Sequence, residues 1–529
     1  MKPAAKLLDR VRRGVQSVAY GNALYQKFLE AGETPGLLRF TPPDIWPGDA
    51  KLGLSLIAEQ AHLFDNPSVA AFRDLPAAIR GLRAAGTDAA RHMTLRLMGH
   101  WLRLYGNWHE VEWAPGPLGE RIASWIGFYE FYAPAASETF IENLSASLSR
   151  QWRHLMRTLP ASAGGLEGLC AIKGLVYGGF NFPEGEKALG LACDLLARQL
   201  RAEILNDGMH ISRNPSLQLH ALRHLLDLRA ALAAAGITAP AELQTAISAM
   251  VPALRFFLCG DGGLALFHGG FEESPLLVEA VLAQSGVKNR ALRRLSASGY
   301  ERLQAGRSLL IADAGPPPPR GYDEAAHAAT SAFEFGQGRE RIVVNCGALP
   351  VGGPEWRLAL ASTAAHSALA VEDTNICDVR MEGLGSAPQV EVQRYEERDV
   401  HCVDVTHDGY RSRFGLLHRR RLRLAKDGDE LQCREMLSGS PGRTFTLRWH
   451  LHPAVQVSLA QGGQAALLRT ASGAGWRLRV EGASLGLEGS IYCGAGEPRK
   501  SLQLKAQGRT QQGETEIVWS LAREKKEKQ

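Results

Sequence analysis

The hydrophobic period of the chain changes near residue 296, from that of a helix to that of a strand. Before this point, segments such as ARHMTLRLMGHWLRLYG and SLQLHALRHLLDLRAALAAAG carry apolar residues three and four positions apart, the spacing of an amphipathic helix. After it, segments such as ERIVVNCG and GWRLRVEG alternate apolar and polar residues between Gly, Asp and Pro turns. The sequence therefore predicts an α+β multidomain protein, with an all-α domain over 1–295 and an antiparallel β-sandwich over 296–529.

The helical half joins its helices by short Gly, Pro and Asn links, which favours antiparallel pairs in either a bundle or a toroid. A chain of 529 residues is also too long for one hydrophobic core. In the second half, the sequence KDGDE predicts a tight hairpin turn. The four prolines Pro316 to Pro319 follow a strand-like segment that begins at Leu309, so we expect a loop inside the β-domain.

Composition restricts the possible binding partners and the cellular compartment of the protein. The net charge of +5 is small for this length and gives no case for nucleic-acid binding. The eight cysteines form no CxxC pair, so neither a zinc ribbon nor a disulfide framework is indicated, and free thiols fit a reducing compartment. No apolar run approaches the roughly 20 residues of a membrane span. The N-terminal 32 residues predict an amphipathic helix rather than a signal peptide, which favours the cytoplasm.

The stretch from Arg341 to Asp373 places a polar turn and His366 between two strand-like segments. Such a turn is a common place for a site, although a lone histidine is more often satisfied by backbone groups in an ordinary hairpin. Two histidines from separate strands and an oxygen ligand would hold zinc, whereas each histidine taken singly is more often structural. The β-domain residues considered are His327, Asn345, His366, His407, His418, His450 and His452. Arg419, Arg420 and Arg421 alternate along a strand and predict a solvated face.

Three motifs in the helical half have both a functional and a structural interpretation. The loop from Trp113 to Arg121, followed by Trp125, would present an arginine and an aromatic platform to a sugar, or simply cap a helix over a buried Trp. The glycine-rich segment around Asp261 and His268 would line a cleft, or form tight turns.

The third motif runs from Asn206 to Pro215, NDGMHISRNP. Its Asn, Asp and Gly predict a turn, and its Ser, Asn and Pro are typical of a helix start. The functional interpretation is that His210 moves a proton while Arg213 binds a carboxylate through two hydrogen bonds, with Asn214 beside them.

Taken together, DGMHISRNP, HAATSAFEF, VNCG, WRLALASTAAHSALAVED, HDGY, HRRRLRL and WHLHP resemble blocks of the heparinase II/III-like polysaccharide lyases, from about Trp113 to Pro453. The resemblance implies an incomplete (α/α) toroid followed by an antiparallel β-domain. It also implies β-elimination on uronic-acid glycans, in which a base removes the C5 proton, the carboxylate is neutralised and an acid protonates the leaving O4.

Several family positions carry other residues in this chain. The His, Asp and His that hold zinc in the family correspond to His327, Asn345 and His366, and a further family histidine corresponds to Ala325. The Asn-His pair of the toroid falls near Leu166 and Glu167. The tyrosine expected beyond Asn345 is absent from CGALPVGG, and Leu217 stands for an aromatic residue.

Three functional hypotheses follow, and the first two rest on the resemblance. The first is a lyase acting on an acidic polysaccharide or oligosaccharide, in which His210 and Tyr410 transfer protons. His327 and His366 would order the side of the substrate cleft formed by the β-domain, and a structural zinc ion is the cofactor considered. The second is a catalytically degenerate glycan-binding or cell-envelope scaffold, since one general acid or base is commonly worth about 10²–10⁴ in rate and the resemblance implies that several are substituted here. A third hypothesis is a cytoplasmic protein of unrelated role. For the compartment, the resemblance implies the periplasm or cell envelope as the alternative to the cytoplasm. The substrate-binding set of the first hypothesis is Arg213, Asn214, Arg121, Trp125, Glu167, His268 and His407.

Overall fold

The computed structural model describes residues 18–58, 74–159 and 164–524. The chain divides into two compact units. Unit 1 comprises residues 1–203 and 220–247, and unit 2 comprises residues 204–219 and 248–529. One division follows Glu203, and the other two fall inside the long helices α13 (Pro215–Ala234) and α14 (Ala241–Phe256). Most of the predicted N-terminal helix, and nearly all of the C-terminal tail, lie outside the described residues.

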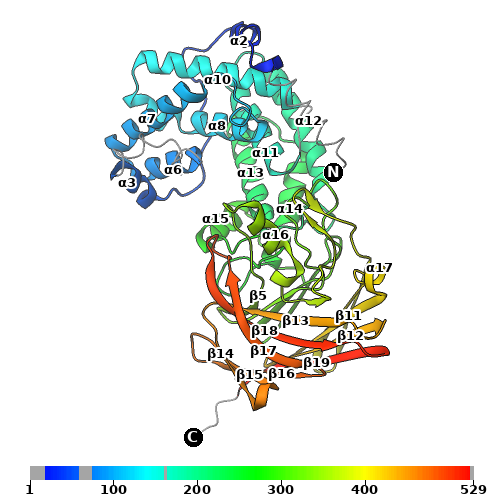
Figure 1. Cartoon of the computed structure of the whole chain (residues 1–529). Coiled ribbons are helices and arrows are strands. Elements are labelled where there is room, and N and C mark those ends of the chain that lie inside the picture. Colours follow the sequence, from blue (N-terminus) through cyan, green and yellow to red (C-terminus); the bar gives the residue numbers. More distant parts are fainter. Residues whose placement is uncertain (1–17, 59–73, 160–163, 525–529) are drawn as a thin grey trace. The chain divides into compact units, whose positions relative to one another are not determined.

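Unit 1 is helical (Figure 1). Its amphipathic segments form helices where the three-four spacing predicts them, and Asp, Thr and Ser side chains cap α6, α7 and α10 at their N-termini. The helices besides α13 and α14 are α2 (Ala23–Glu30), α3 (Ala50–Ala58), α6 (Leu75–Ala85), α7 (Asp88–Tyr105), α8 (Pro115–Gly127), α9 (Tyr129–Tyr132), α10 (Glu138–Thr158), α11 (Gly165–Gly179) and α12 (Gly185–Glu203), with a short 3₁₀ turn η1 (Ala133–Ala135) after α9.

Helices α8 and α11 approach closely because glycines face each other across their contact. A Cβ added at Gly174 would lie 2.4 Å from the Cα of Gly119, and one added at Gly119 would lie 2.2 Å from the carbonyl oxygen of Cys170. No side chain fits such a space, so glycine is required at both positions for this packing.

Unit 2 carries the strands and the helices α15 (Pro275–Ser285), α16 (Pro354–Ala361) and α17 (Arg411–Phe414). Its larger sheet has the order β1-β2-β3-β4-β5-β13-β18-β17, with β6 paired to β13, and its second sheet has the order β14-β15-β16-β19-β12-β11-β10-β9. Every strand pairing within these sheets is antiparallel. Figure 1 shows these strands from green to red. The strands are β1 (Arg294–Leu295), β2 (Tyr300–Ala305), β3 (Ser308–Asp313), β4 (Phe333–Gln337), β5 (Glu340–Val344), β6 (Leu369–Val371), β7 (Val379–Arg380), β8 (Gly383–Leu384), β9 (Val390–Glu397), β10 (Val400–His407), β11 (Leu416–Ala425), β12 (Glu430–Gly439), β13 (Thr444–Leu451), β14 (Gln456–Ala460), β15 (Ala465–Arg469), β16 (Gly475–Glu481), β17 (Ser484–Tyr492), β18 (Arg499–Arg509) and β19 (Gly513–Arg523).

The two large sheets share one hydrophobic core that includes Trp449, Trp476 and Trp519. Strand β11 buries every second residue, which is the alternation expected of a strand with one face on the core. This arrangement confirms the predicted fold class, a helical N-terminal region followed by an antiparallel β-sandwich. The KDGDE turn joins β11 to β12, and the four prolines lie between β3 and β4.

The predicted solvated face on β11 is wrong for one of its three arginines. The side chains of Arg419 and Arg421 are partly exposed and pair with Asp404, whereas Arg420 is fully buried. Alternation along the strand sends Arg420 to the opposite face, toward the core, where Glu435 neutralises it.

Within the three described ranges, no helix is both long enough and apolar enough to cross a membrane.

Candidate functional site

The NDGMHISRNP motif forms a turn and a helix start, as its sequence predicts. A β-bridge between Ile204 and His210 closes the turn. Asn214 caps α13, because its side-chain oxygen accepts hydrogen bonds from the N–H groups of Ser216 and Leu217 at 2.9 and 3.0 Å. Arg213 has a positive φ of 57°, an unusual conformation for a residue with a Cβ. The turn therefore holds Arg213 in a strained backbone, a sign that its side chain is firmly bound.

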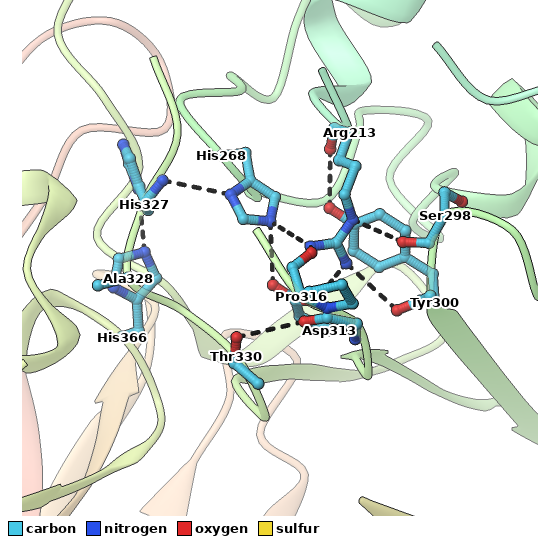
Figure 2. A network of polar contacts seen from close by, with 12 residues as sticks. Arg213, His268, Ser298, Tyr300, Asp313, Pro316, His327, Ala328, Thr330 and His366 are labelled. Atoms are coloured by element: carbon cyan, nitrogen blue, oxygen red, sulfur yellow. Dashed lines mark hydrogen bonds and ion pairs between the residues drawn. The ribbon is translucent and has the colours of Figure 1, made fainter. Parts of the chain in front are cut away.

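The guanidinium group of Arg213 is buried and surrounded by protein acceptors (Figure 2). It donates to the carboxylate of Asp313, Nη2 to Oδ1 at 2.5 Å. It also donates to backbone carbonyls, which belong to Ser298, Gly299 and Pro316. Its face lies over the ring of Tyr300, with Cζ 4.5 Å from the ring centroid. These contacts occupy the donors through which an arginine would clamp a ligand carboxylate.

His268 extends this network toward the histidines of the predicted metal set. Its Nδ1 accepts a hydrogen bond from the backbone N–H of His327 at 3.2 Å, so the neutral ring carries its proton on Nε2. That nitrogen lies 3.0 Å from Oδ2 of Asp313. Burial lowers the pKa of His268, against the opposing influence of Asp313. Burial alone would raise the pKa of Asp313, but Arg213 and His268 hold it below its usual value.

His327 and His366 lie in direct contact, with Nδ1 of His327 3.0 Å from Nε2 of His366. Nδ1 of His366 lies 2.7 Å from the carbonyl oxygen of Ser362, so it carries the proton of the neutral ring. Nε2 of His366 then accepts from His327. Burial lowers the pKa of His366 to about 4 and that of His327 well below its usual value. The two rings therefore form a neutral hydrogen-bonded pair.

Asn345, the third residue of the predicted zinc set, is bound to backbone groups through both ends of its carboxamide. Its Nδ2 donates to the carbonyl of Leu266 at 3.0 Å, and its Oδ1 accepts from the N–H of Ser367 at 3.1 Å. The side chain is fully buried. It does not complete a ligand set with the two histidines, so the residues present do not fit a three-ligand zinc site.

The two residues predicted to transfer protons are buried in unit 2. His210 is 1 % exposed, and its Nδ1 lies 2.8 Å from Oγ of Ser212. Tyr410 is fully buried, and its hydroxyl donates to the carbonyl of Leu369 at 2.8 Å. Burial raises the pKa of Tyr410 far above that of a free tyrosine.

His407 belongs to a second buried network. Its Nε2 lies 2.9 Å from Nδ1 of His418, and Nε2 of His418 lies 2.8 Å from Oε2 of Glu435. Burial and the neighbouring His418 lower the pKa of His407 well below its usual value. The ring of Tyr410 packs against His407 at a centroid distance of 5.7 Å.

The other predicted substrate-binding residues lie in unit 1. Arg121 is buried over the ring of Trp101, and its Nε donates to Oε1 of Gln151 at 2.8 Å. Burial lowers the pKa of Arg121 to about 9. Trp125 is also buried against Trp101. Glu167 is exposed in the first turn of α11. The structure thus brings Arg213, Asn214, His268, His327 and His366 together in unit 2.

Sequence reasoning missed Asp313 and Tyr300. Asp313 is the last residue of β3 and is fully buried, and the hydroxyl of Tyr300 donates to the carbonyl of Arg213 at 2.7 Å. The available signal was the acidic residue at the end of the apolar run LLIAD, a position where an unpaired charge would be costly.

A further polar cluster in unit 1 has the spacing of metal ligands. Glu120, Cys170 and His224 place one ligand atom each within 4.8 Å of one another. Lys173 lies 2.6 Å from Glu120 and 3.3 Å from Asp227, so an ammonium group already neutralises these carboxylates. The group is an ion-paired cluster between α8, α11 and α13.

Comparisons with known proteins agree with this architecture. Residues 287–520 match the family model described as heparinase II/III-like, C-terminal. The chain is 34 % identical over 464 residues to FtsZ-localized protein C of Caulobacter vibrioides (strain NA1000 / CB15N), covering 84 % of this chain and 80 % of that protein.

Solved structures share the fold at low sequence identity. The crystal structure of heparinase III has a TM-score of 0.69 and 12 % identity, covering 84 % of this chain and 75 % of that one. Heparan sulfate lyase HepC from Pedobacter heparinus has a TM-score of 0.63 and 14 % identity, covering 99 % of this chain and 91 % of that one.

A helical N-terminal region followed by this β-sandwich is the fold class of the heparinase III structures. The chain belongs to the heparinase II/III-like family.

Proposed function

We propose that this chain is a non-catalytic member of the family, a scaffold that localises with FtsZ. The observation that carries the proposal is the internal saturation of the side chains that a lyase would turn toward substrate. Arg213 donates to one carboxylate and three backbone carbonyls, and the Tyr410 hydroxyl donates to a fourth. A buried group that already has its partners gains little from an anionic ligand, because it must first break those bonds.

Two further observations support a scaffold. By the family resemblance, the toroid's Asn-His pair falls near Leu166 and Glu167, and neither residue supplies an imidazole. The Caulobacter relative, whose name places it with FtsZ, shares its sequence with this chain across most of both proteins. This likeness favours a shared location, whereas the heparinase III structures share the fold at 12–15 % identity.

The location is tested by imaging a fluorescent fusion of the full chain in its native host together with labelled FtsZ. We expect coincident signals, and we expect the signal of the chain to disperse when FtsZ is depleted. A distribution independent of FtsZ would refute the localisation. A fusion carrying Arg213→Gln serves as a control for folding, because loss of that buried ion pair should lower the protein's abundance.

The absence of turnover is tested separately. Purified chain is incubated with uronic-acid polysaccharides, including heparan sulfate, and the ultraviolet absorbance of unsaturated products is followed beside a heparan sulfate lyase. We expect no product with this chain. Sustained product formation would refute the non-catalytic part of the proposal.

A lyase is the second candidate, and one contact favours it. The ring of Tyr322 lies 6.2 Å from the ring of His210, edge to face, and a histidine–tyrosine pair is suited to proton removal and return. If product forms, His210→Ala and Tyr322→Phe should each reduce the rate by about 10²-fold or more, while the exposed change Arg479→Gln should not.

A further inference from the structure

A cavity of about 340 Å³ in unit 2 is lined by basic residues from three separate segments. The segment after α15 contributes Arg290 and Arg293, and β2 contributes Arg302. Strands β9 and β10 contribute Arg394 and His401. Strand β2 belongs to the nine-stranded sheet, and β9 and β10 lie at the edge of the eight-stranded sheet. The cavity therefore lies where the margins of the two sheets meet, and its lining includes no residue of the Arg213 network.

Two of these arginines are held in place by the protein. Nη1 of Arg394 lies 2.8 Å from Oε2 of Glu301 and donates to the carbonyls of Arg293 and Arg302. Nη2 of Arg302 donates to Oε1 of Gln304 at 3.1 Å. These contacts fix the direction of both guanidinium groups before any ligand arrives, which lowers the entropic cost of binding.

The other two arginines are less engaged. Arg293 lies 3.9 Å from Glu396, beyond direct hydrogen-bond distance, and Arg290 is exposed. Two carboxylates, Glu301 and Glu396, oppose the four guanidinium groups of the cavity. Glu301 also pairs with Arg294 at 2.7 Å. The cavity therefore carries an excess of positive charge, and a low-dielectric wall strengthens its attraction for an anion.

The lining also restricts the kind of anion. Among the residues around this described cavity, the His401 imidazole is the one aromatic ring, and no Trp, Tyr or Phe offers a larger surface on which a sugar or a base would stack; the remaining residues are Ala291, Leu292 and Gln304. Arginine forks match the oxygen geometry of phosphate and bind it through paired hydrogen bonds. A cluster of four guanidinium groups suits a ligand with more than one phosphate group.

We propose that this cavity binds a diphosphate, either free or as the terminal group of a larger molecule. Arg302 and Arg394 form its fixed floor, and Arg290 and Arg293 close over the anion. This role is independent of glycan cleavage and of localisation with FtsZ, so its test is separate from the tests of the proposed function.

The proposal is tested by calorimetric titration of the full chain with inorganic pyrophosphate at near-physiological salt. We expect saturable binding with one site per chain. ADP is titrated in parallel: an affinity like that of pyrophosphate assigns an esterified diphosphate, and a much weaker one assigns the free anion. Sulfate and citrate at equal ionic strength should bind far more weakly.

A pair of double variants locates the site. Arg290→Gln/Arg293→Gln should weaken pyrophosphate binding by about tenfold or more, because two charge-assisted contacts are lost. Arg469→Gln/Arg479→Gln removes the same charge from exposed positions on β15 and β16 and should leave the affinity unchanged. Both pairs are exposed, and circular dichroism is to be used to check that each variant folds. An absence of pyrophosphate binding, equal weakening in both pairs, or equally tight binding of sulfate or citrate would overturn the proposal.

Discussion

Arg420 and Glu435 face each other on neighbouring strands β11 and β12, and both side chains are fully buried. Nη2 of Arg420 lies 2.9 Å from Oε1 of Glu435. Nη1 of the same arginine donates to the carbonyls of Ser331 and Ser367, and the Trp519 indole donates to Glu435. Burial opposes ionisation of Glu435, but Arg420 and His418 hold its pKa far below the usual value. An ion pair therefore lies inside the sandwich, and hydrogen bonds from Nε and Nη1 of Arg420 and from the Trp519 indole surround it.

Removing one member of this pair should destabilise the protein strongly. Arg420→Met leaves the Glu435 carboxylate buried without its cation, so we expect the free energy of unfolding to fall by about 3–5 kcal/mol. Urea denaturation followed by tryptophan fluorescence measures the change. Arg419→Met is the control, because Arg419 is partly exposed beside Asp404 and its loss should cost about 1 kcal/mol or less. Equal losses in the two variants would contradict the assignment.

The pH dependence of the free energy of unfolding should reflect the titration of the Glu334 carboxyl group. Burial raises the pKa of this carboxyl group to about 7, from 4.5 when unfolded. Between these values the folded protein holds a proton that the unfolded chain releases, so this group's contribution to stability should fall as pH rises. Because one pKa unit corresponds to about 1.4 kcal/mol, the total effect is about 3 kcal/mol.

Glu334→Gln removes the titration and keeps an oxygen that can accept from the N–H of Asn345, which lies 3.0 Å from Oε1. We expect thermal unfolding midpoints of this variant to lose the decline between pH 4.5 and 7. Glu391→Gln, at an exposed position on β9, should retain it. A decline that persists in Glu334→Gln would assign it to another group.

The protonation of His366 follows from its contacts. Its lowered pKa of about 4 means that the folded ring stays neutral while an unfolded histidine, with a pKa near 6.5, takes up a proton. Its contribution to stability is therefore present above pH 6.5 and is lost as pH falls toward 4. NMR of protein labelled with ¹⁵N-histidine should show a neutral ring protonated on Nδ1 at pH 5.5, assigned by the signal missing from His366→Gln. An imidazolium signal from this residue at that pH would contradict the hydrogen-bond assignment.

Much of the local structure follows from sequence because short-range chemistry determines it. The Asn214-Pro215 pair starts α13, and the KDGDE turn joins β11 to β12. The burial of Arg420 was not predictable, because alternation places charged residues on both faces of β11 and only the register with Glu435 shows which face is neutralised. The site depends still more on long-range packing, since Arg213 and Asp313 are separated by 100 residues. The motif around Arg213 predicts a charged group at a turn, but its acceptors come from β3 and the loops around it.

Tyr410 provides the last test, because the sequence predicts proton transfer and the structure shows a buried hydroxyl bound to a backbone carbonyl. Tyr410→Phe removes only the hydroxyl, so the carbonyl of Leu369 loses its hydrogen bond while the ring still packs against His407. We expect the free energy of unfolding to fall by about 1–3 kcal/mol, the range for a buried polar group left unsatisfied. Tyr105→Phe, at a half-buried position on α7, is the matched control and should change stability less.

If the chain is a scaffold, the fluorescent Tyr410→Phe fusion should localise with FtsZ as the parent does. A variant of unchanged stability that loses this localisation would instead assign the hydroxyl a direct functional role.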